Sequence, residues 1–302
     1  MYKYKSVPLI IMERKLLVLV VGLFLFFSVV AAGNKNVANI KNNHFPITND
    51  SFQHLGGKNL SSEEITTQST DFAGGSGTSD DPYQIETWEH LNNVRNGLAA
   101  YYELISDLDN SSVGYETYAG KTANNGTGWK SIGIDYYFNG VFDGQYHTIS
   151  DLYIRNRSSN ELGLFSHCDG GSIKNIGILN VNINVTGKEI GGLVGWNLCP
   201  VSNTYVTGTV IGSDNVGGLV GAHSVDGDIT NSFADVDVTG NNEVGGLVGT
   251  VWRESVKNSY ATGSVSGNDR VGGLVGRTGF YSSFSGDYYP GYIRKSYSTG
   301  FV

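Results

Sequence analysis

Few residues of this chain have the types and spacing that catalysis needs. Asp235 and Asp237 are two residues apart, so on a β-strand both side chains would face the same way. Enzymes that cleave polysaccharides use carboxylates gathered on one face in this manner. The flanking repeats carry hydroxyl residues at the matching positions, and the chain has neither an HExxH nor a GxSxG motif. We therefore predict no catalytic residues.

A second group of residues suits binding. The segment Gly279–Tyr292 interrupts an otherwise regular pattern and is rich in aromatic residues. Insertions into a regular scaffold often carry function, and exposed aromatic rings can stack on sugars. The alternative is that these rings fold back over the last repeats as a plug. The candidate ligand-binding residues are Phe280, Tyr281, Phe284, Tyr288, Tyr289 and Tyr292.

The two cysteines form no recognisable metal or redox motif. Cys168 and Cys199 are not part of a CxxC pair, and no acidic calcium-binding loop is present. We expect no metal site and no cofactor. The cysteines could form one disulfide between neighbouring repeats, but their places within the repeat differ by about two residues. Whether they pair is left open.

The strongest signal in the sequence is internal repetition. The pentapeptide GGLVG occurs at Gly191–Gly195, Gly217–Gly221, Gly245–Gly249 and Gly272–Gly276, with spacings of 26, 28 and 27 residues. A second, β-branched element follows each copy. Anchored on the first apolar residue of this element, the repeats begin at Ile149, Ile173, Val201, Ile229, Val256 and Ile293.

Each repeat has the pattern of short strands. Apolar and polar residues alternate with a period of two, and no helical period is found after Ile132. Repeats of this length stack as coils. The sequence therefore predicts an all-β fold, a right-handed parallel β-helix (β-solenoid) of about 27-residue coils. The Leu and Val of GGLVG should point inward, and its paired glycines should allow a corner with positive φ and close approach of the backbone.

Two stacked rows follow from this register. Asn175, Asn203, Asn231 and Asn258 share one repeat position, where their amides can hydrogen-bond along the axis. Aromatic residues recur two positions later, at Tyr205, Phe233, Tyr260 and Tyr297. The aromatic row could be a sugar-binding stripe, but we favour a role in the scaffold.

The first half of the chain divides into three parts. Residues 1–32 combine a basic flank, the uncharged run Leu16–Ala32 and small residues at its end, which predicts a signal peptide. An uncleaved N-terminal anchor is the alternative; otherwise we expect no membrane span in the mature form. Residues 33–70 read as a polar, disordered spacer. Residues 71–135 should form an N-terminal capping region with a helix at Ile85–Leu98, and 136–302 the solenoid, which stops in mid-coil.

Charge excludes one class of partner. The formal net charge is −8, and no run of Lys or Arg follows the leader. Nucleic acid is therefore not an expected partner. Glycans or surface proteins are the partners that we expect.

The chain resembles proteins that carry the GLUG motif. The four GGLVG copies and the NSYATG-like elements at Asn203, Asn231 and Asn258 carry the resemblance, which covers about Gly74 to Val302. The sequence departs from it by a ten-residue excess between Gly276 and Ile293. The resemblance implies large bacterial or archaeal surface proteins, some adhesin-like and some joined to catalytic domains, with no shared catalytic residues.

These observations lead to one functional hypothesis with an alternative. We expect a secreted or cell-surface repeat protein that acts as an adhesion, binding or envelope structural module, and not an enzyme. The alternative is a carbohydrate-active β-helix enzyme, a polysaccharide lyase or glycosidase, or the non-catalytic arm of a larger surface enzyme.

Overall fold

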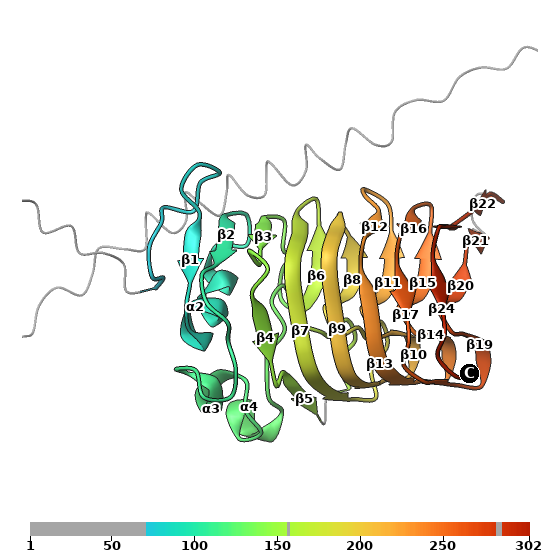
Figure 1. Cartoon of the computed structure of the whole chain (residues 1–302), viewed down its shortest axis with the longest axis horizontal. Coiled ribbons are helices and arrows are strands. Elements are labelled where there is room, and N and C mark those ends of the chain that lie inside the picture. The colour runs from blue at the N-terminus through green and yellow to red at the C-terminus, as the bar shows by residue number, and fades with distance from the viewer. Residues whose placement is uncertain (1–70, 156–157, 282–285) are drawn as a thin grey trace, which may run out of the picture. The chain divides into compact units, whose positions relative to one another are not determined.

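The repeats fold as the coils of a parallel β-solenoid, as the sequence predicts. A computed structural model describes residues 71–155, 158–281 and 286–302, and the strands of successive coils lie side by side along one axis (Figure 1). The expected leader (1–32) and spacer (33–70) lie outside the described residues. No helix of the described part is long and apolar enough to cross a membrane.

Three parallel sheets form the walls of the solenoid. The largest follows the path β1 (Tyr83–Ile85), β2 (Tyr101–Leu104), β3 (Val141–Asp143), β7 (Ser172–Asn184), β9 (Val201–Ile211), β12 (Ile229–Thr230), β16 (Ser255–Lys257) and β23 (Tyr292–Arg294). It also includes β4 (Thr148–Ser150), β5 (Tyr153–Arg155), β13 (Phe233–Thr239), β17 (Tyr260–Ala261), β18 (Val265–Ser266) and β24 (Tyr297–Ser298). We call it sheet 1.

The other two sheets are built from the segments around GGLVG. Sheet 2 contains β6 (Phe165–Asp169), β8 (Val194–Leu198), β11 (Val220–Ser224), β15 (Val248–Trp252) and β20 (Val275–Thr278). Sheet 3 contains β10 (Asp214–Gly217), β14 (Asn242–Gly245) and β19 (Asp269–Gly272). A separate antiparallel hairpin joins β21 (Phe280–Tyr281) to β22 (Tyr288–Tyr289).

The register of sheet 1 confirms most of the predicted coil starts and corrects one. Ile173, Val201, Ile229, Val256 and Ile293 align from coil to coil. Phe142, and not Ile149, is the residue that pairs with Ile173, whereas Ile149 pairs with Ile178 further along β7. The prediction was wrong there because this coil already begins at β3, and Ile149 lies in its second short strand, β4, which pairs further along β7. The parallel pairing reaches back to Tyr83, into the range for which the sequence predicts the cap.

Short helices lie near the N-terminal part of the solenoid, as expected. They are α2 (Trp88–Asn93), a 3-10 turn (Val94–Asn96), α3 (Tyr115–Tyr118) and α4 (Ala123–Gly126). The side chain of Thr87 caps α2 by accepting a hydrogen bond from the N–H of His90, which satisfies one of the free donors at the helix start. Trp88, Leu91 and Val94 are buried, so this face of the helix packs on the first coils. The period of three to four residues in the sequence thus identified the helix, but its predicted start at Ile85 was wrong, because Ile85 belongs to β1 and α2 begins after the cap at Thr87.

The interior is a stack of aliphatic rows. Leu193, Leu219 and Leu247 of the GGLVG segments are fully buried, and so are the valines that follow them. Burying each such side chain stabilises the fold by roughly 1.5–3 kcal/mol. One coil alone could not bury its apolar face, which explains why stability depends on stacking.

The GGLVG glycines are needed for close approach and not for positive φ. All of them have φ outside the positive range, which corrects the predicted conformation. An added Cβ at Gly218 would lie 2.3 Å from the carbonyl oxygen of Gly246 in the next coil. A positive φ occurs instead two residues before each of these glycine-containing segments, at the polar residues Glu161, Glu189, Asn215, Glu243 and Arg270.

Candidate functional site

The outer face of sheet 2 brings together aromatic residues from separate coils. His167 and Trp196 are in register on β6 and β8, and the same row continues through Ala222, Thr250 and Arg277. Trp252 lies at the end of β15, two positions further along the strand than Thr250. These side chains alternate with the buried row of Cys168, Asn197 and His223, so they face away from the core.

The rings form a continuous line along the solenoid axis, which we call the aromatic track. Ring centres are 4.9 Å apart for Tyr137 and His167, 6.1 Å for His167 and Trp196, 5.9 Å for Trp196 and Trp252, and 5.5 Å for Trp252 and Phe280. The track therefore runs from the loop before β3 to the hairpin. It contains Tyr137, His167, Trp196, Trp252 and Phe280.

Small side chains beneath the track allow the indoles to meet. Ala222 lies between β8 and β15 on the outer face, yet it is only 1% exposed. Thr250 is fully buried, and its hydroxyl donates to Glu243 Oε2 at 2.9 Å. A larger residue at Ala222 would separate the rings of Trp196 and Trp252.

The hairpin β21–β22 carries most of the sequence-predicted ligand residues. Phe280 packs on Trp252, and Tyr281 and Tyr288 project with 60% and 59% of their surface exposed. Tyr289 pairs with Phe280 across the hairpin, under the guanidinium of Arg253. The rings therefore extend outward from the last coils as a hairpin, and Phe280 and Tyr289 rest against β15 and the residue after it.

Of the remaining two predicted residues, the structure describes only Tyr292. Tyr292 is in β23, where it pairs with Ser255 and is 43% exposed, beside the guanidinium of Arg294. Phe284 lies outside the described residues. The structure thus joins Phe280 to the track, but it places Tyr292 on sheet 1.

Sequence reasoning missed Trp196 and Trp252. A signal was present, because each indole occupies an outward position of the strand that follows GGLVG. The two residues differ by two positions within their coils, so no single repeat position marks them. Only the side-chain directions bring their rings together.

Charged residues border the track at the corner between sheets 2 and 3. Glu161 Oε2 lies 3.3 Å from Nδ1 of His167. Burial raises the pKa of Glu189, while hydrogen bonds from Arg277, Thr250 and Arg270 outweigh the burial of Glu243 and lower its pKa. Polar side chains therefore border the aromatic rings at this corner, an arrangement suited to a ligand that is both apolar and polar.

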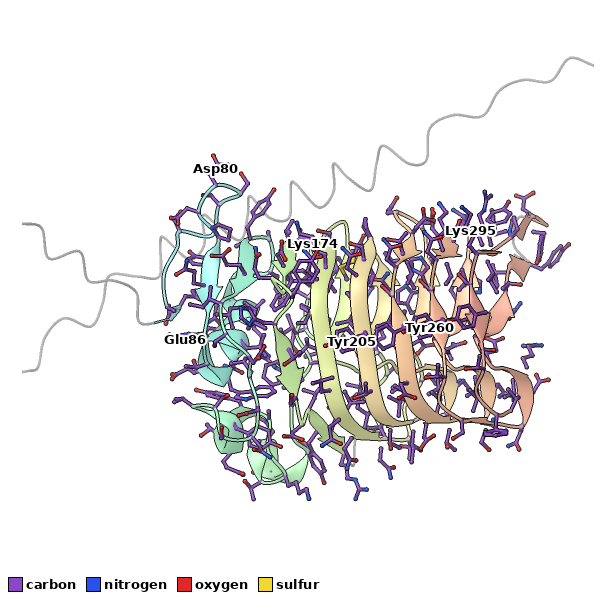
Figure 2. All side chains as sticks on the ribbon, viewed as in Figure 1. Asp80, Glu86, Lys174, Tyr205, Tyr260 and Lys295 are labelled. Atoms are coloured by element: carbon purple, nitrogen blue, oxygen red, sulfur yellow. A yellow bond between two sulfur atoms is a disulfide. The ribbon has the colours of Figure 1, made fainter. Side chains whose placement is uncertain are left out.

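The aromatic row on sheet 1 is built differently. Tyr205, Phe233, Tyr260 and Tyr297 stack with centroid separations of 4.9–5.4 Å and interplanar angles of 3–9°. Figure 2 labels two members of this row, Tyr205 and Tyr260. The ring faces in such a stack cover one another, so only the edges are open to a ligand. This geometry favours a role in the scaffold, which is the interpretation that we preferred from the sequence over a sugar-binding stripe.

The predicted asparagine row is also present. Asn203 donates to Asn175, Asn231 to Asn203, and Asn258 to Asn231, over 2.9–3.3 Å. All four residues have φ near +50°, a conformation that asparagine tolerates better than most residues. At the N-terminal end, Asn175 donates to Asp143 Oδ1 at 3.0 Å and closes the row.

The carboxylate pair is engaged within the scaffold. Thr262 donates to Asp235 Oδ1 over 2.8 Å, and the hydroxyl of Ser264 donates to Asp237 Oδ1 over 2.5 Å. The hydrogen bonds from the hydroxyl and the backbone N–H of Ser264 lower the pKa of Asp237. A glycosidase general acid needs a raised pKa, so Asp237 does not have the electrostatics of such an acid. Within the described residues, no cluster of three or more His, Cys, Asp or Glu could hold a metal.

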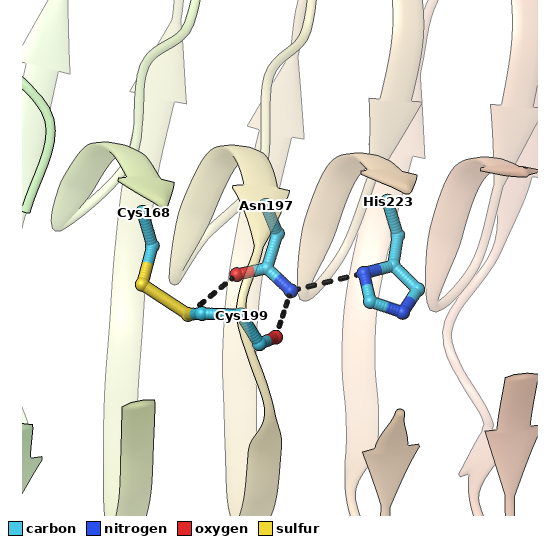
Figure 3. The surroundings of a disulfide bond; sticks show 4 residues. All are labelled: Cys168, Asn197, Cys199 and His223. Atoms are coloured by element: carbon cyan, nitrogen blue, oxygen red, sulfur yellow. Dashed lines mark hydrogen bonds between the residues drawn. A yellow bond between two sulfur atoms is a disulfide. The ribbon is translucent and has the colours of Figure 1, made fainter. Parts of the chain in front are cut away.

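Two polar side chains, those of Asn197 and His223, are buried inside the solenoid beside a disulfide (Figure 3). Cys168 and Cys199 form a disulfide between neighbouring coils, with a Cα–Cα separation of 5.9 Å, which resolves the question that the sequence left open. Asn197 Nδ2 donates to the carbonyl of Cys199 at 2.7 Å and lies 3.0 Å from Nδ1 of His223. Burial lowers the pKa of His223 to about 4. Disulfides are rare in the cytosol, so this bond indicates an extracytoplasmic chain.

Comparison with known proteins identifies the coils. The family model "The GLUG motif" matches residues 212–239 and 240–266, and each match spans one coil, from the corner before sheet 3 to the end of sheet 1. The chain carries GLUG repeats. The resemblance seen in the sequence is confirmed.

Two curated proteins are similar in sequence to part of this chain. Halomucin of Haloquadratum walsbyi is 34% identical over 171 residues, which is 54% of this chain and 2% of the relative. A protein of Evansella cellulosilytica, provisionally named as a Gly-rich membrane protein, is 37% identical over 141 residues, which is 45% of this chain and 15% of the relative. The chain thus matches only a small part of the length of either relative.

A solved structure shares the fold. It is a crystal structure from Bacteroides ovatus, provisionally described as an immunoglobulin A1 protease. The TM-score is 0.51 at 20% identity, and the match covers 76% of this chain and 78% of the other. This likeness shows the solenoid fold alone.

Proposed function

We propose that this GLUG-repeat chain is a surface-displayed module that binds glycans through the aromatic track and its hairpin. The observation that carries the proposal is the unbroken line of rings from Tyr137 to Phe280, which ends at the exposed Tyr281 and Tyr288. Aromatic faces bind the apolar faces of sugar rings, while polar neighbours satisfy the hydroxyls. The solenoid holds these rings at fixed spacing, which reduces the ordering cost of binding.

The site is built for an elongated ligand. Its rings follow the axis over several coils and come from the loop before β3, from separate strands of sheet 2 and from the hairpin. A linear glycan that lies along the axis would contact several rings at once. Each contact would be weak, and affinity would come from their number.

Immobilised polysaccharides test the proposal. We expect retention of the native chain, and about tenfold weaker binding by W252A and by the double variant Y281A/Y288A, since each removes about 1.4 kcal/mol of ring contact. Y146A is the matched control, because Tyr146 is 75% exposed but lies outside the track. Equal losses in all variants, or unchanged binding by W252A, would contradict the proposal.

We further propose a binding role without catalysis. Incubation with the bound polysaccharide should release no reducing ends. Release that disappears in D235N would overturn this and favour the carbohydrate-active alternative.

The proposed location is the cell surface or the medium. The predicted signal peptide at residues 1–32 and the Cys168–Cys199 disulfide both support export. The relative named as a membrane protein agrees with it. Recovery of the chain from intact cells only after lysis, in reduced form, would contradict export.

A further inference from the structure

Charge is distributed unevenly along the solenoid. Residues 71–250 contain 21 Asp and Glu against 7 Lys and Arg, whereas residues 251–302 contain 3 Asp and Glu against 6 Lys and Arg. The last coils and the hairpin are therefore cationic on an otherwise acidic chain. Asp80 and Glu86 mark the acidic end of the solenoid and Lys295 the basic end in Figure 2.

Several Lys and Arg side chains of residues 251–302 have no carboxylate within ion-pair distance among the described residues. Arg270 and Arg277 both place NH1 2.7 Å from the same oxygen, Glu243 Oε1, and Arg270 also has Asp269 Oδ2 at 3.6 Å, so two carboxylates face two guanidinium groups there. Among the described residues, no carboxylate lies within ion-pair distance of Arg253, Arg294 or Lys295. All three are exposed. A field of this sign attracts anions to the hairpin.

Two of these arginines are held by rings of the predicted binding segment. The guanidinium carbon of Arg253 lies 3.8 Å from the ring centre of Tyr289, and that of Arg294 lies 5.5 Å from the ring centre of Tyr292. A guanidinium that stacks on a ring keeps its in-plane N–H groups available as donors. Those donors match the two oxygens of a carboxylate or a sulfate.

We propose that the end of the solenoid formed by residues 251–281 and 286–302 binds acidic polysaccharides, with Arg253 and Arg294 as the anion-binding side chains. The inference rests on the proposed function and names its ligand class, a glycan with carboxylate or sulfate groups. The rings of the hairpin contact the sugar, and the arginines that stack on Tyr289 and Tyr292 receive its charges. The acidic remainder of the chain repels a polyanion, which confines binding to this end.

Binding of dextran sulfate and dextran, and of polygalacturonate and its methyl ester, tests the inference. Each pair differs mainly in charge, and the two acidic members distinguish sulfate from carboxylate. We expect at least tenfold tighter binding of the acidic member of at least one pair, with affinity falling as salt rises. R253Q/R294Q should weaken that binding about tenfold or more. The matched control K121Q/K188Q removes the same charge elsewhere and should change it less than twofold. R253K/R294K keeps the charge and should bind between the two.

The outcomes separate this inference from the proposed function. Equal binding of neutral and acidic members, with the effect of W252A retained, overturns the acidic ligand class and leaves glycan binding intact. Equal loss in the control variant overturns the role of Arg253 and Arg294. Equally tight binding of a DNA oligonucleotide overturns the polysaccharide as the ligand. Absence of binding to all four polysaccharides overturns both proposals. Circular dichroism of each variant checks that the fold is kept.

Discussion

The indole rings of Trp196 and Trp252 stand 5.9 Å apart, edge to face, although their strands are separated by a whole coil. Ala222 on the intervening strand makes room for the contact. The pair therefore ties together three coils on the outer surface, and it forms the centre of the aromatic track.

This contact predicts a measurable coupling. W196A and W252A should each lower the free energy of unfolding, and the double variant should lose about 1 kcal/mol less than the sum, because an edge-to-face pair contributes about that much beyond its buried area. A double-mutant cycle by chemical denaturation measures this. Strict additivity would show that the rings do not stabilise each other.

The asparagine row predicts a position-specific cost. N231A loses the hydrogen bonds to Asn203 and from Asn258 and places Ala at φ near +49°. We expect about 2 kcal/mol of destabilisation. N231G removes the same hydrogen bonds without the conformational strain, so it should cost about half as much. Equal values for the two variants would contradict the assigned role of the backbone conformation.

The glycines of GGLVG predict a steric effect. In G218A the new Cβ would lie 2.3 Å from the Gly246 carbonyl, so two coils must separate, and we expect about 3 kcal/mol of destabilisation. Gly126 is the control, because an added Cβ there meets only the Lys121 carbonyl at 3.9 Å, at φ +83°. G126A should therefore cost only the strain of about 1–2 kcal/mol. Thermal or urea unfolding compares the two.

The disulfide predicts a redox dependence of stability. Cys168 and Cys199 are 31 residues apart, so the closed loop restricts the unfolded chain by about 3–4 kcal/mol in the chain-entropy model. C168A/C199A should lose about this amount under oxidising conditions. Addition of dithiothreitol should destabilise the native chain and leave the double variant unchanged. A response of the double variant to the reductant would point to another cause.

His223 predicts a loss of stability on acidification. Its pKa is about 4 in the folded chain and near 6.5 when unfolded, so the unfolded state takes up the proton first as the pH falls. The stabilisation by neutral His223 is complete above pH 6.5 and is lost between pH 6.5 and 4. Between pH 7 and 5 this residue alone accounts for about 2 kcal/mol.

Urea titrations of the native chain and H223Q at several pH values measure that difference. The variant should show a flatter pH dependence in the same window, whatever its stability at pH 7. The carboxylates with lowered pKa, such as Glu243 and Asp237, lose their contribution at lower pH and affect both proteins alike. Parallel curves for the two proteins would contradict a neutral, buried His223.

Much of this architecture could be predicted from the sequence because it is periodic. The coil length, the inward Leu and Val, the asparagine row and the stack from Tyr205 to Tyr297 all follow from one repeat register. The helix at Trp88 was visible because its apolar spacing differs from that of a strand. Each of these features was predicted from the spacing of nearby residues or from equivalent positions in successive repeats, so the contacts between individual side chains did not have to be known.

The tertiary structure decided the features that break the repeat. Cys168 and Cys199 differ in repeat position, and they pair because Cys199 follows the strand next to that of Cys168. Trp196 and Trp252 differ in the same way, and they meet only across Ala222. Arg253 follows β15 and meets Tyr289 only because the hairpin folds back to this strand, whereas Arg294 and Tyr292 are neighbours on β23. Such contacts depend on how side chains leave the coils, and that direction is set by packing between coils, whereas the coils themselves follow from the alternation of apolar and polar residues along the chain.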